Sequence, residues 1–236
     1  MSLSWDDLPH LFPGLGDPAA WLPLLQRHAA LVEDAAGHTR VTSVPAAEAV
    51  RRQYAECLEL LRIARTVVPT MSPCIDVGSG GGYPGMVFAI AAPDIAITLV
   101  EPLQKRARLL VSMAAELELP NVTVVAARAE DAARGPLRDS AALVTARAVA
   151  ELRELVEYTV PFARPGGWLL LPKGSTAPDE LAAAGAALDA LGCSHRANLP
   201  MRPQVSETLT VLALEKHGPT PLKYPRRPGQ PGKRPL

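Results

Sequence analysis

Five glycines fall within the eight residues from Gly78 to Gly85, directly after a short apolar run. Glycine at this density weakens a helix or a strand, so the backbone here must turn sharply or approach a ligand closely. Gly80, Gly82 and Gly85 satisfy the G-x-G-x-x-G pattern of dinucleotide-binding turns. Asp76 adds a second pattern, an acidic residue followed by alternate glycines, in which the carboxylate would bind an amino group. The stretch predicts a nucleoside-binding turn, with a purely structural turn as the alternative.

Further candidate side chains follow the ends of later apolar segments. Glu101 ends the next such segment, where a carboxylate accepts hydrogen bonds from both hydroxyls of a ribose. Ala129 and Glu130 follow the third segment and would flank an adenine ring, although acidic residues there also suit the start of a helix. Arg147 and Lys173 follow the fourth and fifth segments and would enter the same cleft. The five histidines lie outside every motif.

Strands and helices that alternate along the chain would position these residues. Short strands are predicted at 74–77, 95–100, 122–127, 141–146 and 166–172. Helices are predicted between and after them at 84–92, 102–117, 149–160 and 178–191. This alternation predicts a doubly wound α/β fold, with a mostly parallel sheet and helices on both faces. Two late strands, around 193–199 and 207–215, suit an antiparallel ending and bring the sheet to seven strands.

The first 70 residues have a helical pattern. Asp17 is a candidate N-cap and Pro18 a first helical residue for a helix over 18–35. Its predicted inward face carries Leu22, Leu25, Ala29 and Val32. A second helix is predicted over 45–65, with Ala49, Tyr54, Cys57, Leu58 and Leu61 inward.

Composition excludes several classes of protein. Three widely spaced cysteines without a C-x-x-C motif argue against a disulfide framework and against a zinc site. Neither a signal-peptide pattern nor an apolar run of membrane-spanning length is present, so we expect a soluble cytoplasmic protein.

The C-terminal end is basic and rich in proline. No acidic residue follows Lys216, although the chain as a whole holds 24 basic and 24 acidic residues. Such a tail suits contact with a polyanion, but composition alone favours a solvated, disordered terminus. Six prolines after residue 217 argue against regular structure there.

The order of the motifs resembles the RsmG (GidB) family, which methylates small-subunit ribosomal RNA. The matching segments are DVGSGGGYPG (76–85), LVEPLQKRARLL (99–110), NVTVVAARAED (121–131), VTARAVAEL (144–152), PGGWLLLPKG (165–174) and GPTPLKYPRRPG (218–229). The acidic residue and alternate glycines resemble the first motif of class I S-adenosylmethionine (SAM) methyltransferases, and the Tyr-Pro-Gly ending is specific to the family.

The resemblance implies a Rossmann-like, SAM-dependent methyltransferase that methylates N7 of a guanine in 16S rRNA. It divides the chain into an N-terminal helical segment packed on the main domain (1–70), a methyltransferase domain (71–216) and a basic, proline-rich tail (217–236). With the glycine pattern, it places cofactor contacts at Asp76, Gly78, Gly80, Gly82, Tyr83, Glu101, Pro102, Leu103, Ala129, Glu130 and Arg147.

Substrate contacts follow from the same resemblance. Arg147 and Lys173 are candidates for positioning the guanine or a phosphate, and Lys173, Arg226 and Arg227 are candidate RNA contacts. The partner is 16S rRNA or a small ribosomal subunit particle, the protein is expected to be a monomer, and no metal is expected. Guanine N7 carries a free lone pair, so the reaction needs positioning rather than a general base.

Part of the N-terminal region departs from the family pattern. Residues 40–42 match an N-L-T segment loosely, and Gln53 to Leu58 replace an H-x-x-D-S-L segment. Two other functions stay open, the second of them because of this departure. One is an NAD-linked oxidoreductase on a related sheet, disfavoured by the Asp76 pattern and by the lack of a placed proton donor. The other is a non-catalytic SAM-binding factor in ribosome assembly.

Overall fold

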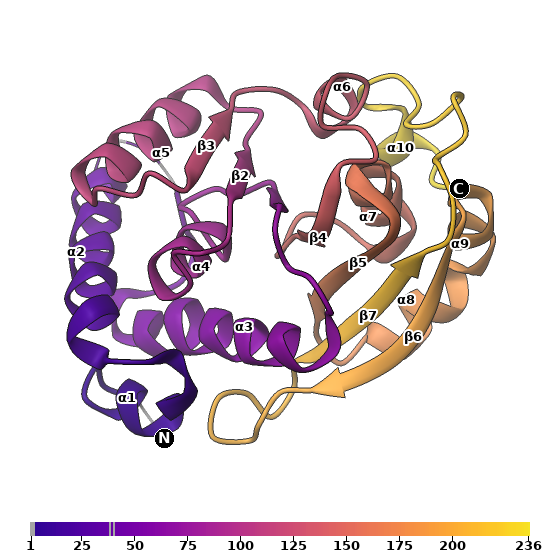
Figure 1. The fold of residues 1–236 in the computed structure, drawn as a ribbon. Helices are drawn as coiled ribbons and strands as arrows, with labels where there is room; N and C mark the ends of the chain where they lie inside the picture. The colour runs from indigo at the N-terminus through magenta and orange to yellow at the C-terminus, as the bar shows by residue number, and fades with distance from the viewer. Residues whose placement is uncertain (1–2, 38, 40) are drawn as a thin grey trace.

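A seven-stranded sheet runs through the protein in the order β3-β2-β1-β4-β5-β7-β6 (Figure 1). The computed structural model describes residues 3–37, 39 and 41–236. The strands are β1 (Cys74–Val77), β2 (Ile97–Val100), β3 (Val122–Val125), β4 (Ala141–Thr145), β5 (Ala163–Lys173), β6 (Cys193–Pro200) and β7 (Thr210–Lys216). Strand β7 is antiparallel to both β5 and β6, and the other pairs are parallel. The predicted doubly wound sheet with an antiparallel ending is confirmed.

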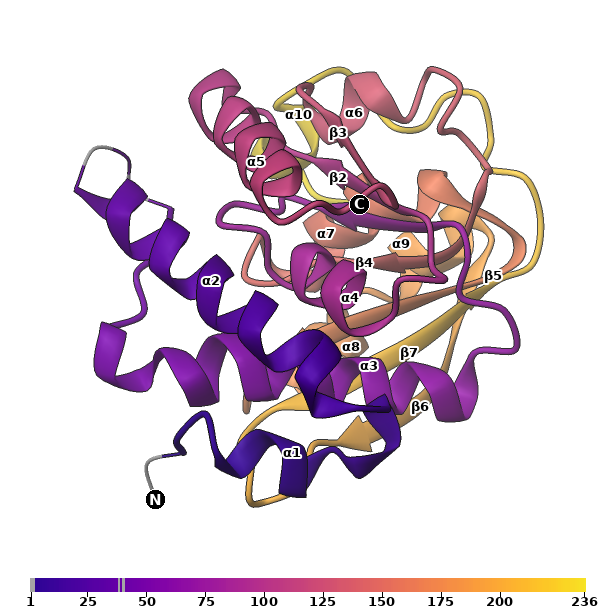
Figure 2. The same ribbon diagram turned by 60° about the vertical axis from the view of Figure 1, so that its left-hand side comes forward.

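Helices cover both faces of the sheet. They are α1 (Asp7–Leu11), α2 (Pro18–Ala36), α3 (Glu56–Val67), α4 (Gly85–Ala91), α5 (Gln104–Glu116), α6 (Ala129–Ala132), α7 (Leu152–Thr159), α8 (Ala177–Ala183), α9 (Gly185–Leu191) and α10 (Gln230–Lys233). Helices α2 to α5 share one hydrophobic cluster, and α6 to α9 share the other (Figure 2). Within the described part of the chain, no helix combines the length and apolar character needed to cross a membrane.

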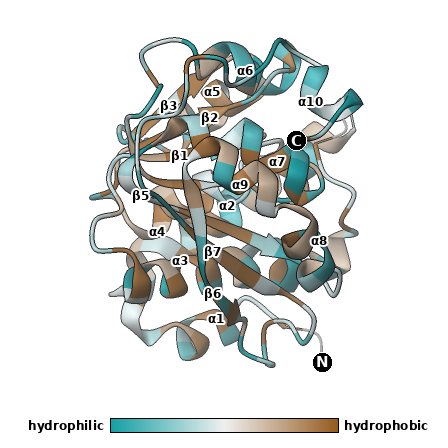
Figure 3. Ribbon diagram, turned by 90° about the vertical axis from the view of Figure 1, so that its right-hand side faces the viewer, coloured by the Kyte–Doolittle hydropathy of each residue, from teal (hydrophilic) through white to brown (hydrophobic). Residues whose placement is uncertain are grey.

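The alternation of side chains along each strand separates the two clusters. Leu170 of β5 faces the α4 side, whereas Leu169 and Leu171 face the α7 side. The strands are apolar on both faces because helices bury both, and Figure 3 shows brown along the strands at the centre of the molecule. Cys74 of β1 belongs to the α4 side, so Asp76, two residues later, also faces that side.

Helix α2 begins as predicted but buries a different stripe. The Asp17 side chain accepts a hydrogen bond from Ala19 N at 3.0 Å, and Pro18 is the first helical residue. Its buried residues, at spacings of four and three, are Trp21, Leu25, His28, Val32 and Ala35. Leu22 and Ala29, also on the predicted face, are half-buried and pack against the same core. His28 was not predicted on this face, because the hydrophobic pattern treats histidine as polar.

Other boundaries also differ from the predictions. The helix predicted over 45–65 begins with a 3₁₀ turn at Ala46–Glu48 and a π-helical turn at Val50–Ala55, and becomes α-helical only at α3. The helix predicted over 178–191 divides into α8 and α9 where Gly185 lowers helix propensity. The one-turn helix α6 follows β3, where the sequence predicted only a loop or a helix start.

The C-terminal tail is folded against the body of the protein, and the predicted disorder is wrong. Arg138 donates to the carbonyls of Thr220 and Tyr224 at 2.6 and 2.9 Å, and Arg134 donates to Pro225 O at 2.9 Å. Lys216, the last residue of β7 before the tail, is fully buried beside Asp139. Backbone carbonyls of the tail accept these hydrogen bonds. Proline lacks the backbone N–H donor but keeps its carbonyl, so a proline-rich segment can still be held in this way.

Arg226 anchors the tail to a buried carboxylate. Its guanidinium forms hydrogen bonds with both carboxylate oxygens of Glu157, which is fully buried on α7, at 2.5 to 3.0 Å. In this conformation Arg226, predicted as an RNA contact, therefore neutralises a buried charge. Arg227 is exposed to solvent.

Replacement of these two neighbouring arginines should have different effects on stability. Arg226→Ala leaves Glu157 buried without its cation and should lower the free energy of unfolding by about 3 kcal/mol. Arg227→Ala, the matched control, should change it by less than about 0.5 kcal/mol. Urea denaturation measures both, and equal losses in the two variants would contradict the anchoring role of Arg226.

Candidate cofactor and substrate site

A cavity of about 800 Å³ opens at the carboxyl ends of the central strands, where strand order reverses between β1 and β4. The turn that follows β1 forms one wall, and residues 41–56 and 206–209 form others. Among the residues predicted from the sequence, the lining includes Gly78, Gly80, Tyr83, Arg147 and Lys173. The reversal point of a doubly wound sheet is the expected ligand position, and the cavity lies there.

Asp76 places a carboxylate beneath the glycine turn. It is fully buried, and burial raises its pKa to about 6. Its Oδ2 accepts a hydrogen bond from Gly85 N at 3.1 Å, while its buried Oδ1 has no hydrogen-bond partner. A Cβ on Gly85 would lie 2.8 Å from Asp76 Cβ and 2.3 Å from Leu99 Cδ2, so only glycine fits there. Asp76 lies behind the turn and is not among the residues that line the cavity, and its unpartnered Oδ1 favours a hydrogen-bond donor such as an amino group.

Glu101 presents a second carboxylate at the end of β2. Its Oε2 accepts from Gly80 N at 2.9 Å and its Oε1 accepts from Leu103 N at 3.0 Å, so the backbone fixes its orientation. Each oxygen retains a further lone pair, as binding of a diol requires. Exposed Pro102 and Leu103, a residue that is 52% exposed, lie next in the chain and offer apolar surface. Glu101 and these neighbours fit a ribose and its base.

Glu130 is bonded to the C-terminal tail. Only 3% of it is exposed, and its Oε1 accepts a hydrogen bond from Gly229 N of the tail at 2.9 Å. Ala129, the first residue of α6, is 9% exposed. The structure therefore gives Glu130 a contact with the tail that the sequence did not predict.

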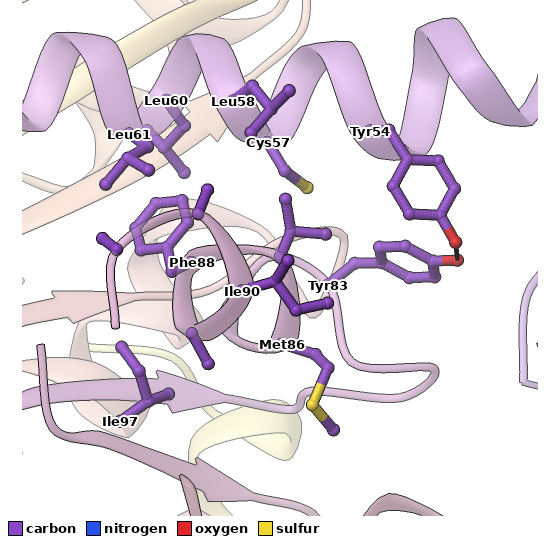
Figure 4. Packing of buried hydrophobic residues seen from close by; sticks show 14 of the residues in the cluster. Tyr54, Cys57, Leu58, Leu60, Leu61, Tyr83, Met86, Phe88, Ile90 and Ile97 are labelled. Carbon is purple, nitrogen blue, oxygen red and sulfur yellow. Dashed lines mark hydrogen bonds between the residues drawn. The ribbon is translucent and has the colours of Figure 1, made fainter. Parts of the chain in front are cut away.

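A chain of three buried side chains supports the glycine turn from behind. His28 Nε2 lies 3.1 Å from Gly81 O, and His28 Nδ1 lies 3.0 Å from Tyr54 OH. Tyr54 OH in turn lies 3.0 Å from Tyr83 OH, and Figure 4 shows this hydrogen bond between the two tyrosines. Burial lowers the pKa of His28 to about 4, so the ring is neutral near pH 7.

The direction of every hydrogen bond in this chain follows from that neutral ring. A carbonyl only accepts, so Nε2 donates to Gly81 O and Nδ1 must accept from Tyr54 OH. The Tyr54 oxygen then accepts from Tyr83 OH. No motif contains His28, but its spacing from Leu25 and Val32 on α2 is the sequence signal that would have identified it as buried.

Gly82 allows His28 to approach the turn. Its φ is +94°, a value that side chains rarely adopt, and a Cβ would lie 2.8 Å from Met86 Cβ and 3.0 Å from His28 Nε2. The predicted cofactor-binding glycines thus also serve packing, since both Gly82 and Gly85 admit protein atoms.

Two predicted cations line the cavity while bonded to the protein. Arg147 Nη1 donates to Arg52 O at 2.5 Å, and the Arg147 guanidinium carbon lies 5.4 Å from the centre of the Tyr83 ring. Lys173 Nζ donates to Ala150 O and to Glu180 Oε2, both at 2.7 Å. Both side chains are therefore fixed in orientation at the rim of the site.

The segment that departs from the family pattern belongs to the same wall. Gln53 Nε2 donates to Thr42 Oγ1 at 2.6 Å, and Arg147 Nη1 lies 3.4 Å from Glu56 Oε2. Burial raises the pKa of Glu56 to about 7, with the nearby Arg147 acting in the opposite direction. Arg40, the first residue of the loosely matching 40–42 segment, lies outside the described residues.

Solved structures of similar shape define the class. A mutant of MtNAS in complex with S-adenosylmethionine is 15% identical, with a TM-score of 0.57 over 91% of this chain and 84% of that one. A SAM-dependent methyltransferase from Aquifex aeolicus is 13% identical, with a TM-score of 0.52 over 79% of this chain and 97% of that one. The fold is that of the class I SAM-dependent methyltransferases.

Sequence comparison defines the family. The family described as rRNA small subunit methyltransferase G, or GidB, matches residues 22–202. The ribosomal RNA small subunit methyltransferase G of Roseiflexus castenholzii is 44% identical over 80% of this chain and 80% of its own. The protein of the same name from Chloroflexus aggregans is 42% identical over 79% and 78%. The chain belongs to this family.

The directed hydrogen-bond chain predicts unequal effects of the same chemical change at two tyrosines. Tyr54→Phe removes the donor to His28 Nδ1 and the acceptor of Tyr83 OH, and should lower the free energy of unfolding by about 3 kcal/mol. Tyr83→Phe removes only the terminal donor and should cost about 1 kcal/mol or less. Thermal and urea unfolding measure the difference. A larger loss in Tyr83→Phe would contradict the assigned direction.

Proposed function

We propose that this protein transfers a methyl group from SAM to N7 of a guanine in 16S rRNA. The observation that carries the proposal is the pair of oriented carboxylates at the ends of adjacent strands, Asp76 with an open acceptor and Glu101 held by two backbone N–H groups. Asp76 would bind the ammonium of the methionine moiety and Glu101 the ribose hydroxyls. The relatives that share the family are named as small-subunit rRNA methyltransferases, which supports the RNA substrate.

SAM supplies an activated methyl group on a sulfonium. In the reaction, the N7 lone pair forms the bond to the methyl carbon, the carbon–sulfur bonding pair returns to sulfur, and the positive charge moves to the purine. No proton has to be removed, so the residues of the chain act by holding the two reactants in line. Arg147, braced on Tyr83, and Lys173 would fix the nucleotide at the cavity, and exposed Arg227 would contact phosphates.

The proposal extends to the setting of the reaction. Ribosomal RNA is modified where subunits are assembled, so the proposal includes a cytoplasmic location. It also includes a monomeric protein that acts on 16S rRNA or on a small-subunit particle. It also retains the division into residues 1–70, 71–216 and 217–236. The tail would act as a brace of the main domain, because Arg226 and Gly229 bond to Glu157 and Glu130.

Cofactor affinity should depend on the ionisation of Asp76. Because its pKa is raised to about 6 in the free protein, the carboxylate that pairs with the ligand ammonium is present above pH 7 and is lost as the pH falls through 6. The Kd for S-adenosylhomocysteine should be constant above pH 7 and rise up to about tenfold per pH unit below 6.

Asp76→Asn is the matched control for this titration. It should bind S-adenosylhomocysteine about 30-fold more weakly at pH 7.5, equivalent to about 2 kcal/mol, and lose the steep dependence between pH 7 and 5. Calorimetric titration measures both proteins. An unchanged slope in Asp76→Asn would show that another group binds the ammonium.

Two measurements separate the proposal from its alternatives. SAM should raise the melting temperature and NADH should not, since only a ligand bound by the folded state stabilises it. Deletion of the gene should remove one N7-methylguanosine from 16S rRNA, as read by mass spectrometry. Stabilisation by NADH alone would favour an oxidoreductase, and binding of SAM with every N7-methylguanosine retained would favour a non-catalytic assembly factor.

A further inference from the structure

Glu56 is a buried carboxylate in the wall of the substrate cavity. Among the described residues that line this cavity, the acidic ones are Glu48 and Glu56. Glu48 is paired with Arg52 at 2.8 Å, and 44% of its side chain is exposed. The Glu56 side chain is only 10% exposed. The Glu56 side chain is therefore much less exposed to water than the Glu48 side chain.

The ion pair of Glu56 is weak for so buried a group. Arg147 Nη1 lies 3.4 Å from Glu56 Oε2, longer than the roughly 2.7–2.9 Å of a strong charge-assisted hydrogen bond. The same Nη1 donates to Arg52 O at 2.5 Å, and the guanidinium lies beside the Tyr83 ring. Arg147 thus orients the carboxylate without saturating its acceptors. Above its raised pKa of about 7 the Glu56 carboxyl is ionised, and a buried carboxylate with unsaturated acceptors favours a ligand that brings hydrogen-bond donors.

The position of Glu56 in the backbone points the same way. It is the first residue of α3 and directly follows the π-helical turn Val50–Ala55. Such turns are uncommon and occur frequently at functional sites. In the preceding turn Tyr54 is fixed by His28 and Tyr83, so the segment that carries Glu56 is bonded to the glycine turn. Glu56 and the cofactor turn are therefore held in one rigid arrangement.

We propose that Glu56 recognises the target guanine by accepting hydrogen bonds from N1–H and from the N2 amino group. This inference rests on the proposed function. Guanine is the RNA base whose Watson–Crick edge carries two adjacent donors, which the two oxygens of one carboxylate match. Bases displaced from a stack are read on that edge. These two hydrogen bonds leave N7, which lies on a different edge of the base, free to face the methyl group.

The same contact would assist the chemical step. Methylation places a positive charge on the purine and makes N1–H a stronger donor, so its hydrogen bond to a carboxylate strengthens as the transition state is approached. Glu56 would thus act in specificity and also in rate. Arg147 is the residue that positions Glu56. The contact between Arg147 and Glu56 is long, and the Arg147 guanidinium is itself held by Arg52 O.

Inosine in place of the target guanosine tests the recognition directly, since inosine lacks only the N2 amino group. Small-subunit particles would be reconstituted with either nucleoside at the methylated position and compared by kcat/KM. The wild-type protein should favour guanosine by about tenfold or more, as expected for one lost hydrogen bond to a charged group. Glu56→Gln should methylate guanosine about 100-fold more slowly and discriminate less than twofold, because its amide cannot accept from both donors.

Three comparisons keep the outcomes distinct. Glu56→Asp retains a carboxylate and should keep part of the discrimination, and Glu33→Gln on the exposed face of α2 should behave as wild type. Glu56→Gln should bind S-adenosylhomocysteine within twofold of wild type. If Glu56→Gln is slow but still discriminates tenfold, Glu56 only positions Arg147 and the inference is overturned. Absence of methylation by the wild-type protein would instead refute the proposed function.

Discussion

The arrangement of the site depends on one half-satisfied carboxylate. Asp76 is enclosed near the end of β1, with one oxygen bonded to Gly85 N and the other without a partner. A buried charge of this kind is unfavourable unless a ligand completes it, so the surrounding structure must supply the stability. Gly85 lacks a Cβ because the Asp76 side chain occupies that space, and the next strand contributes Glu101 to the same turn.

The N-terminal helices complete this site as well as covering the sheet. Helix α2 carries His28 to the carbonyl of Gly81, and the turn before α3 carries Tyr54 to Tyr83. The glycine turn is thus held from the sheet by Asp76 and Glu101, and from the helical layer by a neutral histidine. Glu56 of α3 extends the same layer to the wall of the cavity, where Arg147 from the loop after β4 lies beside it. The binding turn is rigid on both sides, which suits catalysis by alignment.

The sequence predicted the sheet, its order reversal and the carboxylates at strand ends, because short apolar strands and glycine turns are encoded locally. It did not predict contacts between distant segments. In the sequence, His28 lies outside every motif, Glu56 belongs to a segment that departs from the family pattern, and Arg226 was predicted as an RNA contact. Their partners are Gly81, Arg147 and Glu157, far away in the chain. Tertiary packing decides such roles, and it also folds the proline-rich tail that composition described as disordered.

The most direct test of the central claim is transfer of a labelled methyl group by the purified protein. Small ribosomal subunits from cells lacking the gene would be incubated with SAM that carries a labelled methyl, and the 16S rRNA would be digested and analysed by mass spectrometry. The account predicts label on N7 of a single guanine, with about 30-fold slower labelling when Asp76→Asn replaces the wild type at pH 7.5 and limiting SAM. Label on another atom of the base, or on another RNA, would contradict it.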